Sequence, residues 1–396
     1  MRKLFFICNA LDDRTRLERG IVTDSPAASR KVFLLSKAAR KTGVRVLVIS
    51  LGRGKQDGSG RYFRGKAHRV DGVSVIYLPF LHFPVVSELL TLFSSVPVLW
   101  RLHGKKAKKT ILFYNRMPAY LPLLIFAKIL RIETVLDLED GAIDLNHWSL
   151  SGLKSRILSR LFDTLCSGGA LLACRALESA TTLRPTQCCY GTTDTLSTMA
   201  NWDLSPVTVL LGGTVSYETG APLLIDAIRI LRKQSPSWAK NIRFRITGKG
   251  DCLEQFKALA DDPGNPEVIV YGRTTDQEYR QILADTHVGL ALKPNSGALA
   301  DTTFPSKVIE FAGQGILVVT TDISDVRKVL AAGAIYLEAD DPELLIEKLH
   351  WLVENRDAAR AIALNGVQAA SAACSPENVG QMLSDFLFKF STGAQH

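Results

Sequence analysis

The residues best suited to chemistry lie in one short segment of the C-terminal half, residues 304–315. Pro305 and Ser306 are typical of a helix start, where unpaired backbone N–H groups and the helix dipole attract anions. Lys307 would add a positive charge in the first turn, with Glu310 one turn further on the same face. A carboxylate there can accept hydrogen bonds from ribose hydroxyls. The segment predicts a site for a diphosphate beside a sugar, although a capped surface helix with a Lys–Glu pair fits the same pattern.

Glycines end three successive strands expected in the same half. They are Gly212-Gly213 after residues 207–211, Gly248 and Gly250 around the end of 242–247, and Gly272 after 268–271. Ligands of open parallel sheets bind at the carboxyl ends of strands, and glycine lets the backbone approach a phosphate or sugar closely. Each glycine alone is typical of an ordinary strand-to-helix turn. Three in succession indicate a ligand site.

Apolar strands alternate with amphipathic helices along the whole chain. This alternation predicts an α/β protein with parallel sheets, and these sheets would position the strand ends. In the N-terminal half we expect strands at 4–8, 44–50, 73–78, 111–114, 134–138 and 170–174, helices at 26–43 and 121–130, and loops at 12–23 and 53–69. In the C-terminal half the alternation runs through 207–354. The predicted organisation is an N-terminal Rossmann-like domain at 1–185, a linker at 186–206, a C-terminal Rossmann-like domain at 207–370, and a C-terminal helix at 371–396 able to pack back on the first domain.

The amino-acid composition limits the classes of partner that the protein is expected to bind. The net charge is +9, which suits a phosphate-bearing substrate or anionic lipid, and no nucleic-acid-binding signature is present. The seven cysteines are scattered and form no CxxC pair, which is typical of free thiols in a reducing compartment. We expect no metal site, because the acidic pairs Asp261-Asp262 and Asp340-Asp341 resemble loop and cap residues. The short apolar run after Met1 fits a buried strand better than a signal peptide, and no stretch is long enough to span a membrane.

A candidate membrane-surface patch follows the third strand. An apolar stretch at 80–100 precedes a basic cluster that consists of Arg101, Lys105, Lys106, Lys108 and Lys109. Such a pair of segments suits an anionic bilayer surface and a lipid-linked acceptor. A helix packed on the sheet, followed by a solvated basic turn, fits equally well. The expected location is cytoplasmic, either free or peripheral to the inner face of the cell membrane.

The segment at 304–315, with the apolar residues 317–319 after it, resembles the donor-site motif of family 4 retaining glycosyltransferases of the GT-B fold (glycosyl transferases group 1). That motif often reads Pro-Ser-Lys-x-x-Glu-(Tyr/Phe)-x-x-x-Gly, and the glycine-bearing strand ends match in order. The resemblance implies two Rossmann-like domains that face each other across a cleft, a nucleotide-sugar donor in the second, an acceptor in the first, and no cofactor. Retention of the anomeric configuration is also implied.

The resemblance assigns donor binding to Gly213, Thr214, Gly248, Lys249, Gly250, Gly272, Arg273, Pro305, Ser306, Lys307 and Glu310. Two departures stand out: residues 212–220 lack the Arg and Lys that usually neutralise the diphosphate, and Thr302 stands where the family has its first glutamate. Lys307, Lys249 and Arg273 are the candidate replacements.

Glu310 is the candidate catalytic residue of the second domain, and Glu139 and Asp140, after a buried strand, are those of the first. Glu139 or Asp140 could orient the acceptor hydroxyl or stabilise a positively charged sugar in the transition state, although Asp140 also fits a helix N-cap. His147 is a weaker candidate. The expected activity is metal-independent transfer to a glycan or lipid-linked acceptor in polysaccharide or glycoconjugate biosynthesis. The alternatives are a nucleotide-sugar epimerase of the same fold and a non-catalytic GT-B homologue that acts as a partner protein.

Overall fold

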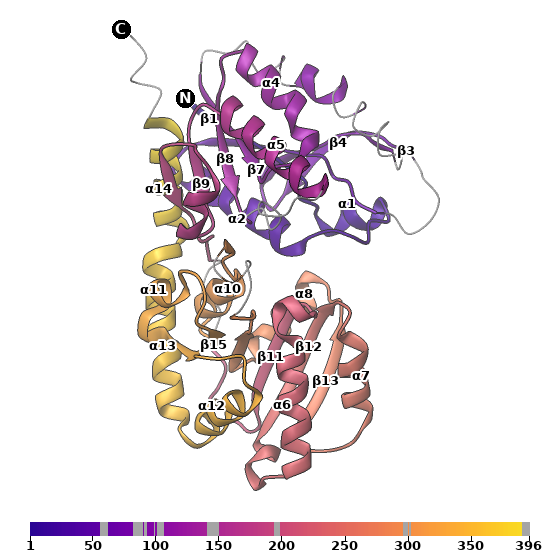
Figure 1. The fold of residues 1–396 in the computed structure, drawn as a ribbon, viewed down its shortest axis with the longest axis vertical. Helices are drawn as coiled ribbons and strands as arrows, with labels where there is room; N and C mark the ends of the chain where they lie inside the picture. The colour runs from indigo at the N-terminus through magenta and orange to yellow at the C-terminus, as the bar shows by residue number, and fades with distance from the viewer. Residues whose placement is uncertain are drawn as a thin grey trace. The chain divides into compact units, whose positions relative to one another are not determined.

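The computed structural model divides into two compact units (Figure 1). The N-terminal unit is Met1–Thr192 together with the chain from Pro376 onwards, and the C-terminal unit is Thr193–Ser375. The structure describes residues 1–55, 62–81, 90, 93–98, 100, 107–140, 150–193, 199–295, 300 and 302–389.

Within these described residues, an eight-stranded sheet forms the N-terminal unit. Its strands, in spatial order, are β10 (Thr186–Cys188), β9 (Ala170–Leu172), β8 (Glu133–Leu138), β7 (Lys108–Tyr114), β1 (Arg2–Cys8), β2 (Arg45–Ser50), β5 (Val73–Tyr77) and β4 (Lys66–Val70). All neighbours are parallel except β4, which runs antiparallel to β5. The central strands are continuous apolar runs because helices cover both faces of a parallel sheet.

Four helices of this unit lie in two layers. The first layer is α4 (Leu121–Ile129) and α5 (Leu150–Leu165), which pack against each other over β8 (Figure 1). The second is α2 (Pro26–Lys41) and α14 (Pro376–Lys389), which pack together on β1, β2 and β7. Ser25 caps α2 as the sequence predicts, since its hydroxyl accepts from the Ala28 N–H at 3.3 Å.

The C-terminal segment contains two helices where the sequence suggested one from residue 371. α13 (Arg356–Cys374) ends before Ser375, whose backbone is extended, and Pro376 then begins α14. α14 is fixed to the N-terminal unit by polar contacts as well as by apolar packing. The Thr110 hydroxyl donates to the Leu387 carbonyl at 2.8 Å, and the Lys108 ammonium bonds the Phe388 carbonyl.

Two expectations for the N-terminal half were wrong. The expected loop at 12–23 contains α1 (Asp13–Glu18), which is capped by the Asp12 carboxylate, and the expected loop at 53–69 contains β4 and β3 (Tyr62–Phe63). β3 pairs with β6 (Phe80–Leu81) in a separate ribbon. β10 lies within the expected linker, 186–206, and the division between the two units, after Thr192, falls in the same range. β4 and β10 are edge strands with polar residues, so they lack the apolar signal that reveals a central strand.

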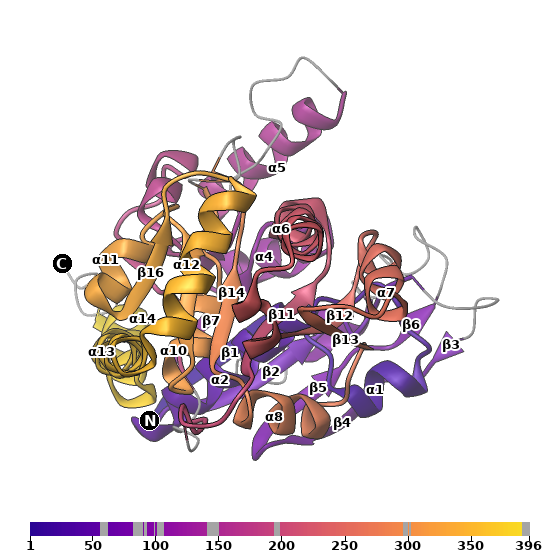
Figure 2. The same cartoon turned by 90° about the horizontal axis from the view of Figure 1, so that it is seen from below.

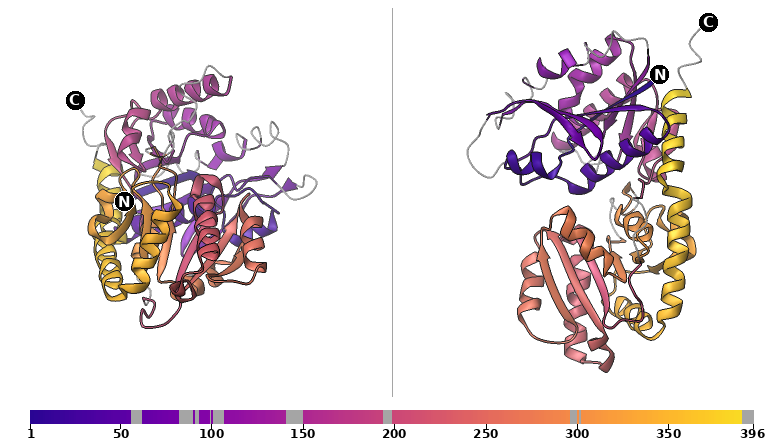
Figure 3. Two further views of the ribbon diagram at one scale, coloured as in Figure 1. Left: turned by 60° about the horizontal axis from the view of Figure 1, so that its bottom comes forward. Right: turned by 180° about the vertical axis from the view of Figure 1, so that it is seen from behind.

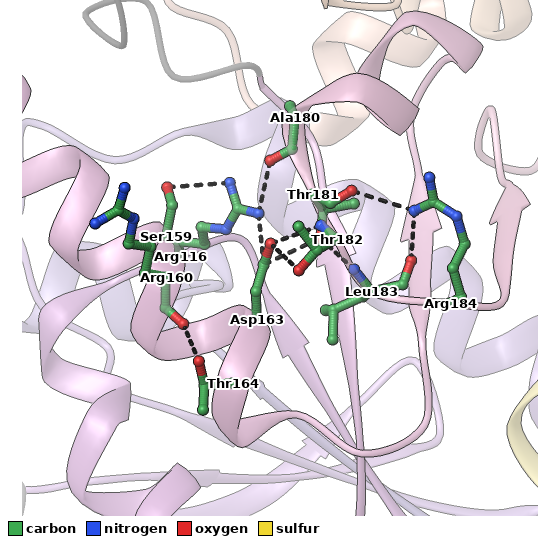
Figure 4. A network of polar contacts seen from close by, with 10 residues as sticks. All are labelled: Arg116, Ser159, Arg160, Asp163, Thr164, Ala180, Thr181, Thr182, Leu183 and Arg184. Atoms are coloured by element: carbon green, nitrogen blue, oxygen red, sulfur yellow. Dashed lines mark hydrogen bonds and ion pairs between the residues drawn. The ribbon is translucent and has the colours of Figure 1, made fainter.

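A polar network centred on Asp163 holds α5 in place (Figure 4). Arg116, from the turn after β7, donates to Asp163 at 2.8 Å, to the Ser159 hydroxyl at 3.2 Å and to the Ala180 carbonyl at 2.9 Å. The Thr182 N–H donates to the other Asp163 oxygen at 2.7 Å. Charge-assisted bonds to a largely buried carboxylate are stronger than neutral ones, so this network fixes α5 against the segment before β10.

The C-terminal unit contains a six-stranded, all-parallel sheet in the described residues. Its spatial order is β13 (Glu267–Gly272), β12 (Ile242–Lys249), β11 (Val207–Thr214), β14 (Val288–Ala291), β15 (Leu317–Thr321) and β16 (Ala334–Leu337). On one face lie α6 (Ala221–Gln234), α7 (Leu253–Asp261) and α12 (Pro342–Glu354), and on the other α8 (Asp276–Ala284), α10 (Lys307–Gly313), α11 (Val326–Leu330) and α13 (Figures 2 and 3). The strand and helix order predicted for 207–354 is confirmed, with one helix added: α11, between β15 and β16, was not predicted.

Candidate functional site

The strand order of the C-terminal unit defines where a ligand would bind. β11 lies in the middle of the sheet, and the chain builds β12 and β13 on one side of it and β14, β15 and β16 on the other. This reversal is a topological switch point, and the carboxyl ends of the strands beside it form a crevice in doubly wound sheets. β11 ends there with Gly212, Gly213 and Thr214.

Lys307 lies at this strand end and is held by two partners. Its Nζ donates to Glu310 Oε2 at 2.6 Å, one turn along α10, and to the Tyr279 hydroxyl of α8 at 2.8 Å. The same Nζ lies 4.7 Å from the centroid of the Tyr279 ring, within the range of a cation–π contact. The Lys307 side chain is 25% exposed and that of Glu310 12%, so the pair is largely buried rather than a solvated surface pair.

The electrostatics of Lys307 keep it charged. Burial acts to lower the pKa of Lys307, but the Glu310 carboxylate and the Tyr279 hydroxyl outweigh burial and leave that pKa raised. The ammonium therefore persists throughout the physiological pH range. A fixed cation at a strand end is what an anionic ligand requires.

The helix start differs from the prediction. α10 begins at Lys307, and Ser306 precedes it in a helical backbone conformation without a side-chain cap bond. The Pro305 and Ser306 carbonyls accept from the N–H groups of Val308 and Glu310. α10 spans only seven residues, so its dipole is small and the Lys307 ammonium is the main positive charge at this end.

The glycines of the strand ends have different physical roles. A Cβ on Gly213, whose φ is +110°, would lie 3.3 Å from Lys307 Cε, so a side chain there would crowd the lysine. A Cβ on Gly248 would lie 1.6 Å from the Gly213 carbonyl oxygen, and one on Gly250 2.1 Å from that of Val215. Gly248 and Gly250 thus serve the close packing of the chain on itself. A Cβ on Gly272 would meet open space.

The other predicted donor residues lie around the same strand ends. Lys249 ends β12 beside Thr214 in register, and Arg273 follows β13 with an exposed side chain. Thr302 lies in the segment before α10.

Sequence reasoning missed two residues of this site. Tyr279 lies on an exposed amphipathic helix, where nothing in the sequence marks its contact with Lys307. Lys293 follows β14 by two residues, and its ammonium donates to the Thr303 hydroxyl at 2.6 Å. The rule that ligands bind at strand ends could have identified Lys293, because β14 is the strand next to β11.

A second charged cluster lies at the carboxyl end of β8 in the N-terminal unit. The Lys31 ammonium of α2 donates a hydrogen bond to the Glu139 carboxylate, and the same Nζ lies 3.7 Å from Asp137 Oδ1. Asp137 is fully buried, and neither of its carboxylate oxygens has a hydrogen-bond donor among the described residues. Asp140 is exposed, and the Asn115 amide donates to it at 3.5 Å. The two catalytic candidates of this domain therefore differ: Glu139 is engaged by a lysine, whereas Asp140 faces solvent.

Burial and neighbouring charges shift the titration of this cluster. Burial raises the pKa of Glu139 to about 8, and Asp137 acts in the same direction, while Lys31 opposes both. Burial acts to lower the pKa of Lys31, but the two carboxylates outweigh it and leave that pKa raised. Lys31 stays charged, and Glu139 changes its charge near neutral pH.

Several predicted features lie outside the described residues: His147, Arg101, Lys105, Lys106, much of 80–100, and the segment after Asp140 where a helix cap was considered. Of the basic cluster, Lys108 and Lys109 are described. Both belong to β7, and Lys108 bonds the end of α14, so Lys108 is a structural contact of the sheet rather than part of a solvated patch.

Two kinds of feature are absent from the part of the chain that the structure describes. None of its helices is both long enough and apolar enough to cross a bilayer. No three of its His, Cys, Asp or Glu side chains gather as ligands of a metal ion would.

The sequence and the fold of this chain are similar to those of known proteins. Residues 205–355 match the family model described as Glycosyl transferases group 1. A phosphatidylinositol N-acetylglucosaminyltransferase subunit from Arabidopsis thaliana is 21% identical over 328 residues, which are 80% of this chain and 69% of the plant protein.

Solved structures match over almost the whole chain, and two of them illustrate the similarity. Anabaena HepE, in complex with UDP and glucose, has a TM-score of 0.68 at 16% identity, and the match covers 98% of this chain and 99% of HepE. Sucrose-phosphate synthase from Thermosynechococcus elongatus has a TM-score of 0.68 at 12% identity, and the match covers 99% of this chain and 100% of the synthase. The shared arrangement of strands and helices therefore includes both units.

Proposed function

Because residues 205–355 match the glycosyl transferases group 1 model and the chain has the GT-B fold, we propose that the protein is a retaining glycosyltransferase. It transfers a sugar from a nucleotide-sugar donor to a glycan or lipid-linked acceptor, in polysaccharide or glycoconjugate biosynthesis. The observation that carries the proposal is Lys307, held beside Gly213 at the switch point of the C-terminal sheet. The structures of HepE with UDP and with UDP-glucose support a nucleotide-sugar donor.

Lys307 would act on the leaving group. As the bond between the anomeric carbon and the diphosphate oxygen breaks, negative charge develops on the diphosphate, and a fixed cation stabilises it. Without ligand, Glu310 holds Lys307 in place at 2.6 Å. A diphosphate carries more charge than one carboxylate, so it can draw the ammonium away and leave Glu310 to accept hydrogen bonds from ribose hydroxyls.

The second cation and the acceptor side complete the proposed mechanism. Lys249, Arg273 and Lys293 follow or end strands of the same sheet edge, and they can replace the Arg and Lys that residues 212–220 lack. We assign the acceptor to the carboxyl end of β8, where Asp140 is exposed and Glu139 half-buried. The reaction needs no cofactor. We expect transfer to persist in excess EDTA, and a strict requirement for added Mg²⁺ or Mn²⁺ would contradict that mechanism.

A panel of nucleotide sugars tests the function. We expect at least one donor to raise the Tm, and Glu310→Gln to weaken that donor's binding by about tenfold, the loss of one charge-assisted hydrogen bond. Glu254→Gln, in the exposed Lys257–Glu254 pair of α7, is the matched control and should bind as wild type does.

Assays with and without an acceptor distinguish a glycosyltransferase from an epimerase and from a non-catalytic partner. Transfer that requires an acceptor supports the proposal. A chemically altered donor sugar in the absence of acceptor indicates an epimerase. A protein that binds no donor is a non-catalytic partner, and Thr302 and the missing Arg and Lys would explain its loss of donor binding.

We also assign the protein a place at the cytoplasmic surface of an anionic membrane. The net charge of +9 gives a general attraction to such a surface, and a lipid-linked acceptor would be anchored there.

A further inference from the structure

The outer faces of α4 and α5 carry apolar side chains that the fold does not bury. On α5, Leu153, Ile157 and Leu161 recur every four residues and are all exposed, so they form one stripe along the helix. On α4, Ile125 and Ile129 have the same spacing, and Ile129 is 70% exposed. Because α4 and α5 pack side by side in the same layer (Figure 1), the two stripes belong to one side of the unit.

An aromatic side chain extends this surface. Trp100 is 64% exposed, and its ring centroid lies 6.2 Å from that of Phe126 on α4. Tryptophan combines a large apolar ring with one N–H donor, and it favours the boundary between hydrocarbon and water. Isolated exposed apolar residues are common, but a grouped set on two adjoining helices indicates a contact surface.

The charged residues around these stripes have one sign. The described residues of α4, the turn after it and α5 include five basic side chains, which are Lys128, Arg131, Lys154, Arg156 and Arg160. Over the same described residues the single acidic side chain is Asp163, which Arg116 and the Thr182 N–H engage. The surface therefore combines apolar groups with a net positive charge, which is the combination that anionic lipid headgroups and acyl chains complement.

We propose that this surface, formed by Ile125, Ile129, Leu153, Ile157, Leu161 and the four exposed basic residues Lys128, Arg131, Lys154 and Arg160, is where the protein docks on an anionic bilayer. The apolar side chains enter the boundary between headgroups and acyl chains, and the basic ones bind lipid phosphates. The inference names the contact surface for the membrane partner proposed above, and it does not depend on the sugar-transfer reaction. A protein docked in this way would act on an acceptor anchored in the same leaflet.

Flotation of the purified 396-residue protein with vesicles tests the docking surface. We expect binding to phosphatidylcholine vesicles that contain phosphatidylglycerol, weak binding to phosphatidylcholine alone, and release by salt. The double variant Leu153→Ser/Ile157→Ser and the double variant Lys154→Gln/Arg160→Gln should each bind about tenfold more weakly. All four of these side chains are exposed, so the fold should persist in both variants.

Matched controls come from the C-terminal unit. Leu364→Ser removes an exposed leucine of α13, and Arg229→Gln/Lys233→Gln removes two exposed charges of α6. Both should float as the wild type does. Tryptophan emission should shift to the blue on anionic vesicles, and Trp100→Phe should reduce that shift.

Three results would overturn the inference, and they separate its parts. Absence of binding at low salt contradicts both the membrane partner and the surface. Binding that the α4 and α5 variants leave unchanged contradicts the surface alone. A stable dimer in solution that Leu153→Ser/Ile157→Ser dissociates would show that a second copy of the chain covers this face.

Discussion

Both units place a lysine beside a glutamate at the carboxyl end of a parallel strand, yet the two pairs are built differently. In the N-terminal unit, Lys31 serves two carboxylates, Glu139 and the fully buried Asp137. In the C-terminal unit, Lys307 serves one carboxylate, Glu310, and the neutral hydroxyl of Tyr279. Lys31 thus lies between two carboxyl groups of the N-terminal core, whereas Lys307 has one carboxylate and one neutral hydroxyl as partners at a strand end. The comparison predicts a structural role for the first lysine and a functional role for the second.

The largest expected effect is on stability, from Lys31→Met. Removal of the ammonium leaves the fully buried Asp137 without its counter-charge, which costs about 3–5 kcal/mol in the free energy of unfolding. Chemical denaturation measures this loss. Lys37→Met is the matched control on the same helix, because Lys37 forms an exposed pair with Asp71 and should change stability by less than about 1 kcal/mol. Equal effects of the two variants would contradict the structural role of Lys31.

The next effect is on transfer, from Lys307→Ala. Loss of a cation that stabilises the leaving diphosphate should lower kcat/KM by about 100-fold at a temperature where the variant is still folded, as thermal unfolding verifies. Lys257→Ala is the control, because Lys257 forms a pair of the same spacing with Glu254 on the exposed face of α7. Unchanged transfer by Lys307→Ala would mean that another residue, such as Lys293 or Arg273, serves the phosphates.

Tyr279→Phe sharpens the comparison further, because it keeps the ring beside Lys307 and removes the hydroxyl. We expect about a tenfold loss of kcat/KM, and a larger loss for Tyr279→Leu, which also removes the cation–π contact. Tyr336→Phe removes a hydroxyl that bonds the Ala331 carbonyl at the far edge of the same sheet, and it should have no effect on transfer. If Tyr279→Phe transfers as wild type does, the hydroxyl does not position Lys307.

The last expected effect is a pH dependence of the N-terminal unit. The pKa of Glu139 in the folded protein, about 8, lies above its ordinary value of 4.5, so the folded state holds a proton that the unfolded chain releases. The stability that this proton gives is complete below pH 4.5, falls as the pH rises, and is lost above pH 8.

Thermal unfolding or hydrogen exchange of α2 and β8 at about pH 6 and about pH 9 measures this fall. Glu139→Gln should reduce it, because the amide does not ionise. Glu377→Gln is the control: its exposed carboxylate has a lowered pKa, so it stays ionised in both states across this range. A fall in Tm that is the same in wild type and Glu139→Gln would show that other groups cause it.

Local pattern was enough to predict the two parallel sheets and the strand ends that bear the candidate site. Continuous apolar runs such as those of β1 and β11 mark central strands because both faces of such strands are buried. The link between Lys307 and Glu310 was also predictable, since residues three apart in a helix meet on one face. The edge strands β4 and β10 were not, because their exposed faces tolerate polar residues.

Which distant residues meet became known only from the folded chain. Lys31 and Glu139 are 108 positions apart, and Tyr279 and Lys307 are 28 apart on different helices. No local pattern encodes such contacts, because they arise from the way each helix crosses its sheet. The same holds for the glycines: Gly213 and Gly248 look alike in the sequence, and the packing alone shows that Gly213 adjoins Lys307 while Gly248 makes room for the backbone of the neighbouring strand.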